Sequence, residues 1–516
     1  MLRYRRARPH LAALAAITLT LGSAEALAQA APGNPAPWLA EDSSVARPEG
    51  EFDGSDSSRF EKTPRTYGNP PGFGAGRTGF VSSKVGRKLQ SKPAKRLLPA
   101  VVTARAQRIA PFPELPGLST GPTTILTPPL PRRKLAPKLD PYEPLGVRLR
   151  SFIVKPAVEI SGGYDTNPFR STKPTGSPLI VVAPELLIHS DWSRHELRAD
   201  LRGSYTAYPS LSSLDRPYFS SKIDGRVDVT RQTRIDLQHR FVVSTENPGS
   251  PDFQEDTIEP TTYTSIGGTA GLAHRFNRLE VGGKIGADRT RYQDARLNDG
   301  TIESNEDRNF AQYGFGLFAN YELSPAFKPY VQVETDRRVH DLAVDRSGIE
   351  RDSRGVLPKI GTTFELTHLL TGDVSLGYLT RNYEDPSLQE LKGIIADAAL
   401  IWSATRLTTV TFAAKSSALE STDPEISGVL ARDFGVQIDH SLRRWLLATL
   451  KFGVGLDDYV GSARKDQRFL ASAALTYKMS RTMQLKGEVR RESRSSNQPD
   501  EDYTANIFLL GLRLQR

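Results

Sequence analysis

Apolar and polar residues alternate in short segments from residue 152 to residue 516. A period of two indicates β-strands, because successive side chains of a strand point to opposite faces. The connections alternate in length as well: a tight turn at 191–194 is followed, two segments later, by a long acidic loop at 247–260. Bacterial membrane barrels combine short turns at one end with longer loops at the other. The pattern predicts an all-β fold, a transmembrane antiparallel β-barrel.

One face of the alternating segments is densely charged. In residues 196–205, Leu197, Ala199 and Leu201 alternate with charged side chains. Lipid excludes a charged strand face, so we expect this face to border a water-filled lumen. The predicted pore-lining residues are Glu159, Arg198, Asp200, Arg202, Lys222, Asp224, Arg226, Asp228, Asp236, Arg240, Gln332, Glu334, Asp336, Arg338, Lys486, Glu488 and Arg490. Such charges either orient solutes across an open pore or pair with one another and seal it.

The number of strands follows from the short turns. Candidate turns lie near Ser193, Gln232, Asn277, Pro325, Leu369, Thr405, Arg443 and Ser480. Eight turns join nine hairpins and predict about eighteen strands, with sixteen as the alternative. An even number places both ends of the barrel, and therefore the N-terminal arm and the C-terminus, in the periplasm.

Aromatic residues gather near both kinds of connection. Trp192, Trp402 and Trp445 flank short turns. Near the longer loops lie Tyr205, Tyr208, Tyr218, Tyr263, Tyr292, Tyr383, Tyr459 and Tyr503. Amphipathic rings concentrate at the two membrane interfaces, so we expect two outward-facing aromatic bands.

The region before the strands has a different composition. Residues 1–30 combine an arginine-rich start, an apolar run and small residues at a cleavage site, which predicts a secretory signal peptide. Residues 31–147 are rich in proline and glycine, and residues 81–150 carry fourteen Lys and Arg against three acidic residues. We expect a disordered basic periplasmic arm at 31–147, followed by the barrel at 148–516. No folded basic surface is predicted, so nucleic acid is not an expected partner.

The segment 163–170 closes the first predicted strand with the sequence GYDTNPFR. Its residues Gly163, Tyr164, Asp165, Asn167, Phe169 and Arg170 match a stretch that members of the β-barrel porin type 2 family often carry at this place. Together with the strand pattern, the chain resembles that family of Gram-negative outer-membrane proteins. The resemblance implies an outer-membrane barrel without enzymatic activity, in some cases encoded near cell-surface polysaccharide systems. Asp165 and Asn167 favour a turn, with a polar cluster at the pore mouth as the alternative.

No pattern of catalytic or metal-ligating residues emerges. His340 and Asp341, like Asp457 and Asp458, fall near strand ends, but no Ser/His pair at a recognisable spacing accompanies them. The chain contains no cysteine, and the histidines lack zinc-ligand spacing. Residues 299–306 resemble half of a calcium loop whose first ligands are missing. We expect no enzyme activity, no metal and no cofactor.

The leading hypothesis for function is a porin-like channel for hydrophilic solutes. The alternatives are the outer-membrane component of a surface or exo-polysaccharide export system, or a closed structural barrel. Expected partners are outer-membrane lipid and lipopolysaccharide, hydrophilic solutes or polysaccharide, and a periplasmic partner of the basic arm, which otherwise acts as a tether.

Overall fold

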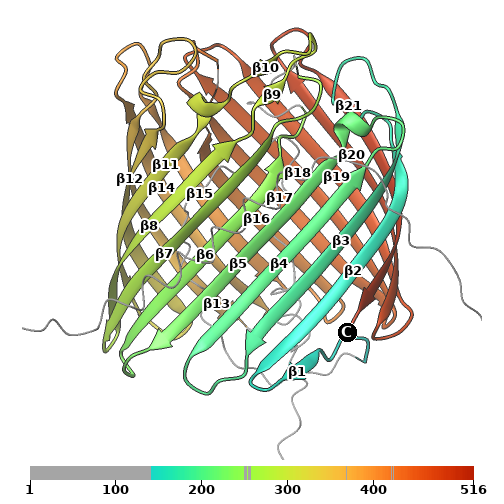
Figure 1. Cartoon of the computed structure of the whole chain (residues 1–516). Helices are drawn as coiled ribbons and strands as arrows, with labels where there is room; N and C mark the ends of the chain where they lie inside the picture. Colours follow the sequence, from blue (N-terminus) through green and yellow to red (C-terminus); the bar gives the residue numbers. More distant parts are fainter. Residues whose placement is uncertain (1–140, 249–252, 254–256, 368, 420, 422) are drawn as a thin grey trace, which may run out of the picture. The chain divides into compact units, whose positions relative to one another are not determined.

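The structure, a computed structural model, describes residues 141–516 except 249–252, 254–256, 368, 420 and 422. The predicted signal peptide and nearly all of the predicted arm lie outside the described residues. The described part is one closed antiparallel barrel (Figure 1). Among these residues, no helix has the length and hydropathy needed to cross a bilayer.

Eighteen strands form the wall, as the turn pattern predicts. They are β2 (Phe152–Asp165), β3 (Ser177–Ser190), β4 (Glu196–Ala207), β5 (Arg216–Asp228), β6 (Thr233–Thr245), β7 (Thr262–Phe276), β8 (Leu279–Tyr292), β11 (Phe310–Tyr321), β12 (Phe327–His340), β13 (Ser353–Thr367), β14 (Leu370–Tyr383), β15 (Leu391–Trp402), β16 (Thr408–Leu419), β17 (Gly428–Arg443), β18 (Leu446–Val460), β19 (Lys465–Lys478), β20 (Met483–Ser496) and β21 (Tyr503–Gln515). Each strand pairs with the next in the chain, β8 with β11. Pairing of β21 with β2 closes the barrel.

Short elements decorate the wall. Strand β1 (Val147–Leu149) pairs with the start of β2, and β9 (Ala295–Arg296) with β10 (Ile302–Glu303) within one long loop. Two 3-10 turns, η1 (Ser212–Leu214) and η2 (Glu306–Arg308), lie in other long connections. All eight predicted short turns fall at or beside the connections at one end of the barrel, which confirms that prediction. We call this the short-turn end and the opposite one the long-loop end.

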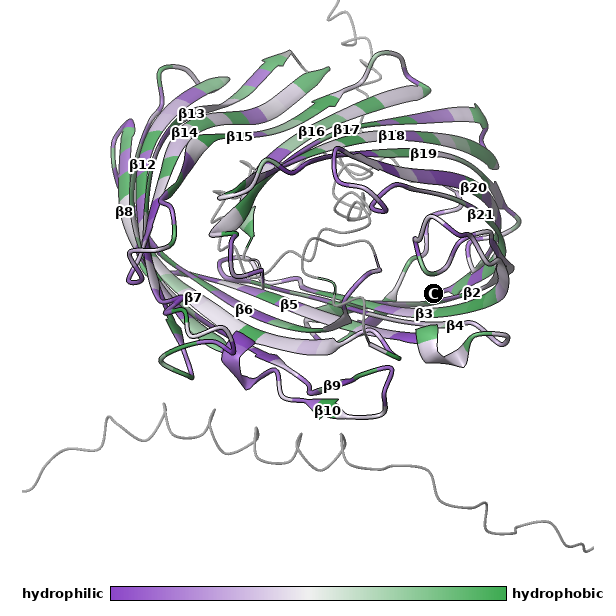
Figure 2. Ribbon diagram, turned by 90° about the horizontal axis from the view of Figure 1, so that it is seen from above, coloured by the Kyte–Doolittle hydropathy of each residue, from purple (hydrophilic) through white to green (hydrophobic). Residues whose placement is uncertain are grey.

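The registers sort the side chains into two faces. On one face, which we call the apolar face, large hydrophobic side chains are exposed around the barrel: Ile160 is 51% exposed, Ile360 63% and Leu510 62%. The other face, the charged face, carries most of the ionic side chains of the strands. Figure 2 shows hydrophobic and hydrophilic residues alternating along the strands. An exposed apolar band is the surface that lipid requires.

The aromatic prediction holds at one end only. At the short-turn end Trp192, Trp402 and Trp445 are each 40–44% exposed, as an interface band requires. At the long-loop end Tyr205 is 49% exposed. In contrast, Tyr208, Tyr263, Tyr459 and Tyr503 are buried, so the prediction of a second outward band is wrong for these four. Three of the four lie beneath arginine guanidinium groups, those of Arg216, Arg464 and Arg494, which hold the rings among the loops.

Candidate functional site

Ion pairs that skip a strand identify the inner surface of the barrel. Asp336 of β12 and Arg381 of β14 are 2.6 Å apart, although β13 runs between them. The β13 residue registered with both is Gly355, and a Cβ atom there would collide with the two side chains. Side chains of second-neighbour strands converge on the concave side of a curved sheet and diverge on the convex side. The charged face is therefore the inner face.

The same arrangement recurs around the wall, and we call its members strand-skipping pairs. They are Arg240–Asp288 at 2.7 Å over Gly267, Lys284–Glu334 at 3.5 Å over Gly316, Asp336–Arg381 over Gly355, Lys359–Asp397 at 3.0 Å over Gly377, and Asp433–Arg468 at 3.0 Å over Gly455. In each case a glycine leaves room for the pair above the intervening strand. The pairs link the wall laterally in addition to the backbone ladder.

The register places all seventeen residues predicted to line the pore on the charged face. Several are paired along their own strand: Arg202 with Asp200 at 2.8 Å, Arg226 with Asp228 at 2.8 Å, and Glu488 with Arg490 at 2.8 Å. Lys486 reaches Glu159 from two strands away at 3.7 Å. The set contains eight acidic and eight basic side chains, so neither sign dominates this surface.

Exposure varies strongly around the charged face. The side chains of Lys222 and Asp224 on β5 are 56% and 45% exposed. In contrast, Arg338 on β12 and Glu488 on β20 are buried. The arc formed by β4 and β5 therefore offers charges to solvent, whereas much of the opposite arc uses its charges in the wall.

Several charged residues of the inner face escaped the sequence prediction. Lys284, Asp288, Arg381, Lys359 and Asp397 all take part in strand-skipping pairs. A signal exists in the sequence, because each pair has a glycine on the strand between its members. Reading that signal requires the registers of three strands, which the alternation pattern does not provide.

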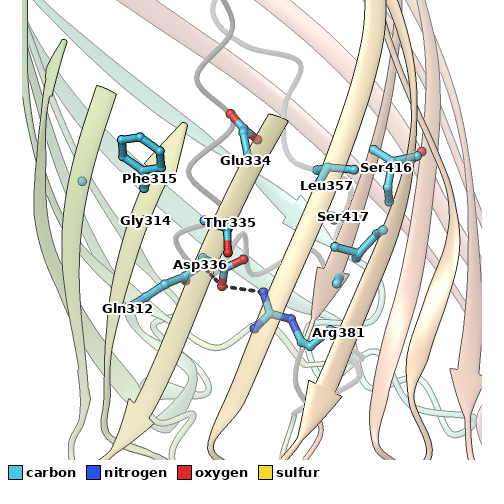
Figure 3. A pocket seen from close by; sticks show the side chains of 14 residues that line it. Gln312, Gly314, Phe315, Glu334, Thr335, Asp336, Leu357, Arg381, Ser416 and Ser417 are labelled. Atoms are coloured by element: carbon cyan, nitrogen blue, oxygen red, sulfur yellow. Dashed lines mark hydrogen bonds and ion pairs between the residues drawn. The ribbon is translucent and has the colours of Figure 1, made fainter. Parts of the chain in front are cut away.

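A recess of about 710 Å³ lies against the strands from β8 to β16 (Figure 3). Its polar part holds Gln312, Glu334, Asp336 and Arg381, and its apolar part Leu357, Leu379, Ile395 and Ala418. Within the described structure, the buried Nε of Arg381 and Oγ of Ser417 have no hydrogen-bond partner. These two groups could bind a polar group of a solute while its apolar part contacts the leucines.

The segment 163–170 builds a buried latch across the closing seam. Asp165 accepts a hydrogen bond from the Asn167 amide at 2.9 Å, the Asx turn that its sequence favours. Arg170 forms ion pairs of 2.8 Å with both Asp165 and Glu492 of β20. Burial opposes the charge of Arg170, but the two carboxylates outweigh burial and raise its pKa. Since Asp165 is fully buried, this polar cluster ties the first long loop to the last strands.

The other candidate chemical groups take part in ordinary loop contacts. His340 lies 3.3 Å from Asp352, and Asp299 accepts hydrogen bonds from Thr301 within a turn. Among residues 141–516, apart from the gaps given above, no group of three His, Asp or Glu side chains is placed to hold a metal ion.

Two aspartates in the long loops fasten them, and they predict a pH response. Burial alone would raise the pKa of Asp345, but hydrogen bonds from Arg351 and from the Ile349 and Ser347 amides lower it. A lowered pKa stabilises the loop above the ordinary aspartate value of about 3.9, and this stabilisation is lost as the pH falls below it. A fluorophore on Ser347→Cys should keep constant anisotropy from pH 8 to pH 5 and lose it below about pH 4.

The matched control for this measurement is the same label in an Asp345→Asn chain, whose anisotropy should be low throughout. A fall between pH 7 and pH 5 would contradict the assignment to this carboxylate.

Comparisons with known proteins agree with the architecture. The family model "Putative beta-barrel porin 2" matches residues 140–516. Similar solved structures include OpdK from Pseudomonas aeruginosa (11% identity, 70% of this chain and 99% of that one, TM-score 0.37) and a BenF-like porin from Pseudomonas fluorescens Pf-5 (11%, 71% and 100%, TM-score 0.38). A third is Pseudomonas aeruginosa OccK2 in complex with glucuronate (10%, 70% and 98%, TM-score 0.38). No curated protein sequence matches significantly. Since the family model spans the entire barrel, the chain belongs to the family "Putative beta-barrel porin 2" and is a porin-like protein of the outer membrane.

Proposed function

We propose that the barrel lets small hydrophilic solutes diffuse across the outer membrane with weak charge selectivity. The observation that carries this proposal is the balance of the inner face, where charges of both signs are paired within the wall. Paired charges leave a polar, wettable surface without a strong field of either sign. The seventeen residues predicted to line the pore would form much of that surface.

The exposed arc of β4 and β5 gives this proposal its selectivity test. The wild-type protein in a planar bilayer with a KCl gradient should give a reversal potential near zero. Arg198→Gln, Arg202→Gln and Arg226→Gln together remove three positive charges from that arc, so the triple variant should become cation-selective by roughly two- to fivefold. The matched control is Arg354→Gln, whose side chain is 64% exposed and lies on the apolar face. A wild-type barrel that never conducts would refute the proposal.

We further infer that the short-turn end, the N-terminal arm and the C-terminus face the periplasm, because long loops are extracellular in bacterial barrels. Protease added to intact cells should then cleave only within the long loops. The basic arm is proposed to act there as a tether or an electrostatic contact for a periplasmic partner. Transport of a surface polysaccharide is the competing function. A deletion strain that loses its surface polysaccharide while solute uptake is unchanged would favour that alternative.

A further inference from the structure

Strands β15 and β16 are joined along only part of their length. Their ladder comprises five registered pairs, from Trp402↔Val410 to Ala398↔Ala414. The neighbouring ladders are much longer; that of β16 with β17, for example, continues to Leu419↔Val429. Over the described residues, the outer parts of β15 (391–397) and β16 (415–419) thus run on without a registered partner between them.

The two strands separate because one slides over the other. Ala418 of β16 and Leu430 of β17 lie on the apolar face of their strands. They pack against Leu379, Leu391 and Ile395, which lie on the inner face of β14 and β15. Leu391 and Leu430 are almost completely buried in this contact. The wall therefore has two layers here, and the break can be followed between β15 and β16 in Figure 2.

We call residues 415–419 and 428–432 the folded-in hairpin, because they cover the inner surface of the wall. A glycine permits the contact: a Cβ atom at Gly393 would lie 2.5 Å from Cδ2 of Leu430. At the point of separation, Ser416 Oγ replaces the missing ladder and bonds both the amide and the carbonyl of Ala396, each at 3.1 Å.

The long-loop end of the hairpin is also fastened. Arg351, from the β12–β13 loop, donates hydrogen bonds to the carbonyls of Ser421, Asp423 and Ile426 at 2.7, 3.0 and 3.3 Å. The guanidinium thereby holds the connection between β16 and β17. Since Arg351 itself is paired with Asp345, the latch belongs to the same pH-sensitive loop described above.

A second position of the hairpin is available to the same strands. Continuing the existing register would pair Gly393 with Leu419 and Ile395 with Ser417. That arrangement restores the backbone hydrogen bonds that a membrane wall otherwise lacks along these edges. It would also turn Ala418 and Leu430 towards lipid, which accepts them. Each position thus satisfies one requirement, apolar packing in the first and backbone pairing in the second.

We propose that the folded-in hairpin is a gate made from the barrel wall. In the position described it occupies part of the lumen; when it pairs fully with β15, the lumen widens and Leu379, Leu391 and Ile395 become exposed to passing solutes. The proposal rests on the proposed channel function for its consequence, but the two positions themselves are independent of conduction.

Cysteine pairs can capture both positions, because the chain has no native cysteine. Gly393→Cys with Leu430→Cys should cross-link the hairpin in the lumen, and Gly393→Cys with Leu419→Cys should cross-link it in the wall. Both pairs should form under mild oxidation in membranes, detected by gel mobility, with heat-modifiable migration as the check on folding. In bilayers the first cross-link should lower conductance and the second raise it, each reversed by reductant.

Gly393→Val provides a measurement without cross-links. Its side chain excludes Leu430 and should shift the hairpin towards the wall, so conductance should rise by about twofold or more. The single Gly393→Cys variant controls for the same bias in the cysteine pairs. The gate is overturned if the Gly393/Leu419 pair never forms while the Gly393/Leu430 pair forms completely, or if neither forms. Formation of both pairs in a barrel that never conducts would count against the channel alone.

Discussion

Arg170→Ala should produce the largest loss of stability of any single substitution in the first long loop. The change leaves Glu492 and Asp165 buried without their shared cation. Removing one partner of a buried ion pair costs about 3–5 kcal/mol, because the remaining charge has no solvent. The folded, heat-modifiable band in detergent should disappear at a temperature at which the wild-type barrel still migrates as folded.

Two variants define the cause of this loss. Arg354→Ala removes a cation whose ion pair with Glu384 is largely exposed, so its effect should be below about 1 kcal/mol. Arg170→Ala combined with Asp165→Asn and Glu492→Gln removes the stranded charges and should recover part of the stability. Equal stabilities of Arg170→Ala and the wild-type protein would mean that the latch does not hold the seam.

Gly355→Ala should have the second-largest effect. The new Cβ atom would enter the space that Asp336 and Arg381 use to meet above β13. Either the ion pair separates or the strand shifts, and overpacking of this kind costs about 1–3 kcal/mol. The midpoint of urea-induced unfolding from lipid vesicles should fall accordingly.

The matched control lies two strands away on the same inner face. Gly314 is registered with Asp336 as well, but the nearest atom to a Cβ there is the Thr335 carbonyl oxygen at 3.9 Å. Gly314→Ala should therefore be neutral or slightly stabilising, since alanine suits a strand better than glycine. A loss at Gly314 as large as that at Gly355 would show that backbone freedom, and not the ion pair, requires glycine at these positions.

The sequence predicted the barrel because its evidence is local. Alternation within one segment is enough to assign faces, and the turns at Asn277 and Ser480 announce themselves by composition. The tyrosine prediction was wrong because nearness to a loop does not determine the face: Tyr205 points outwards and Tyr208 inwards, although they lie three residues apart. Strand-skipping pairs require three registers at once. The folded-in hairpin could not be predicted, because Ala418 and Leu430 suit lipid as well as they suit the inner wall.

The strand-skipping pairs have a consequence for the evolutionary history of the barrel. Barrels are expected to change size by gaining or losing whole hairpins, which preserves the alternation of turns and loops. Removing the hairpin of β13 and β14 would strand Asp336 on one side and Asp397 on the other, since their partners Arg381 and Lys359 lie within it. A duplication would likewise insert strands between partners. Relatives with other strand numbers should therefore differ most along the arcs where no pair skips a strand, such as β4 and β5.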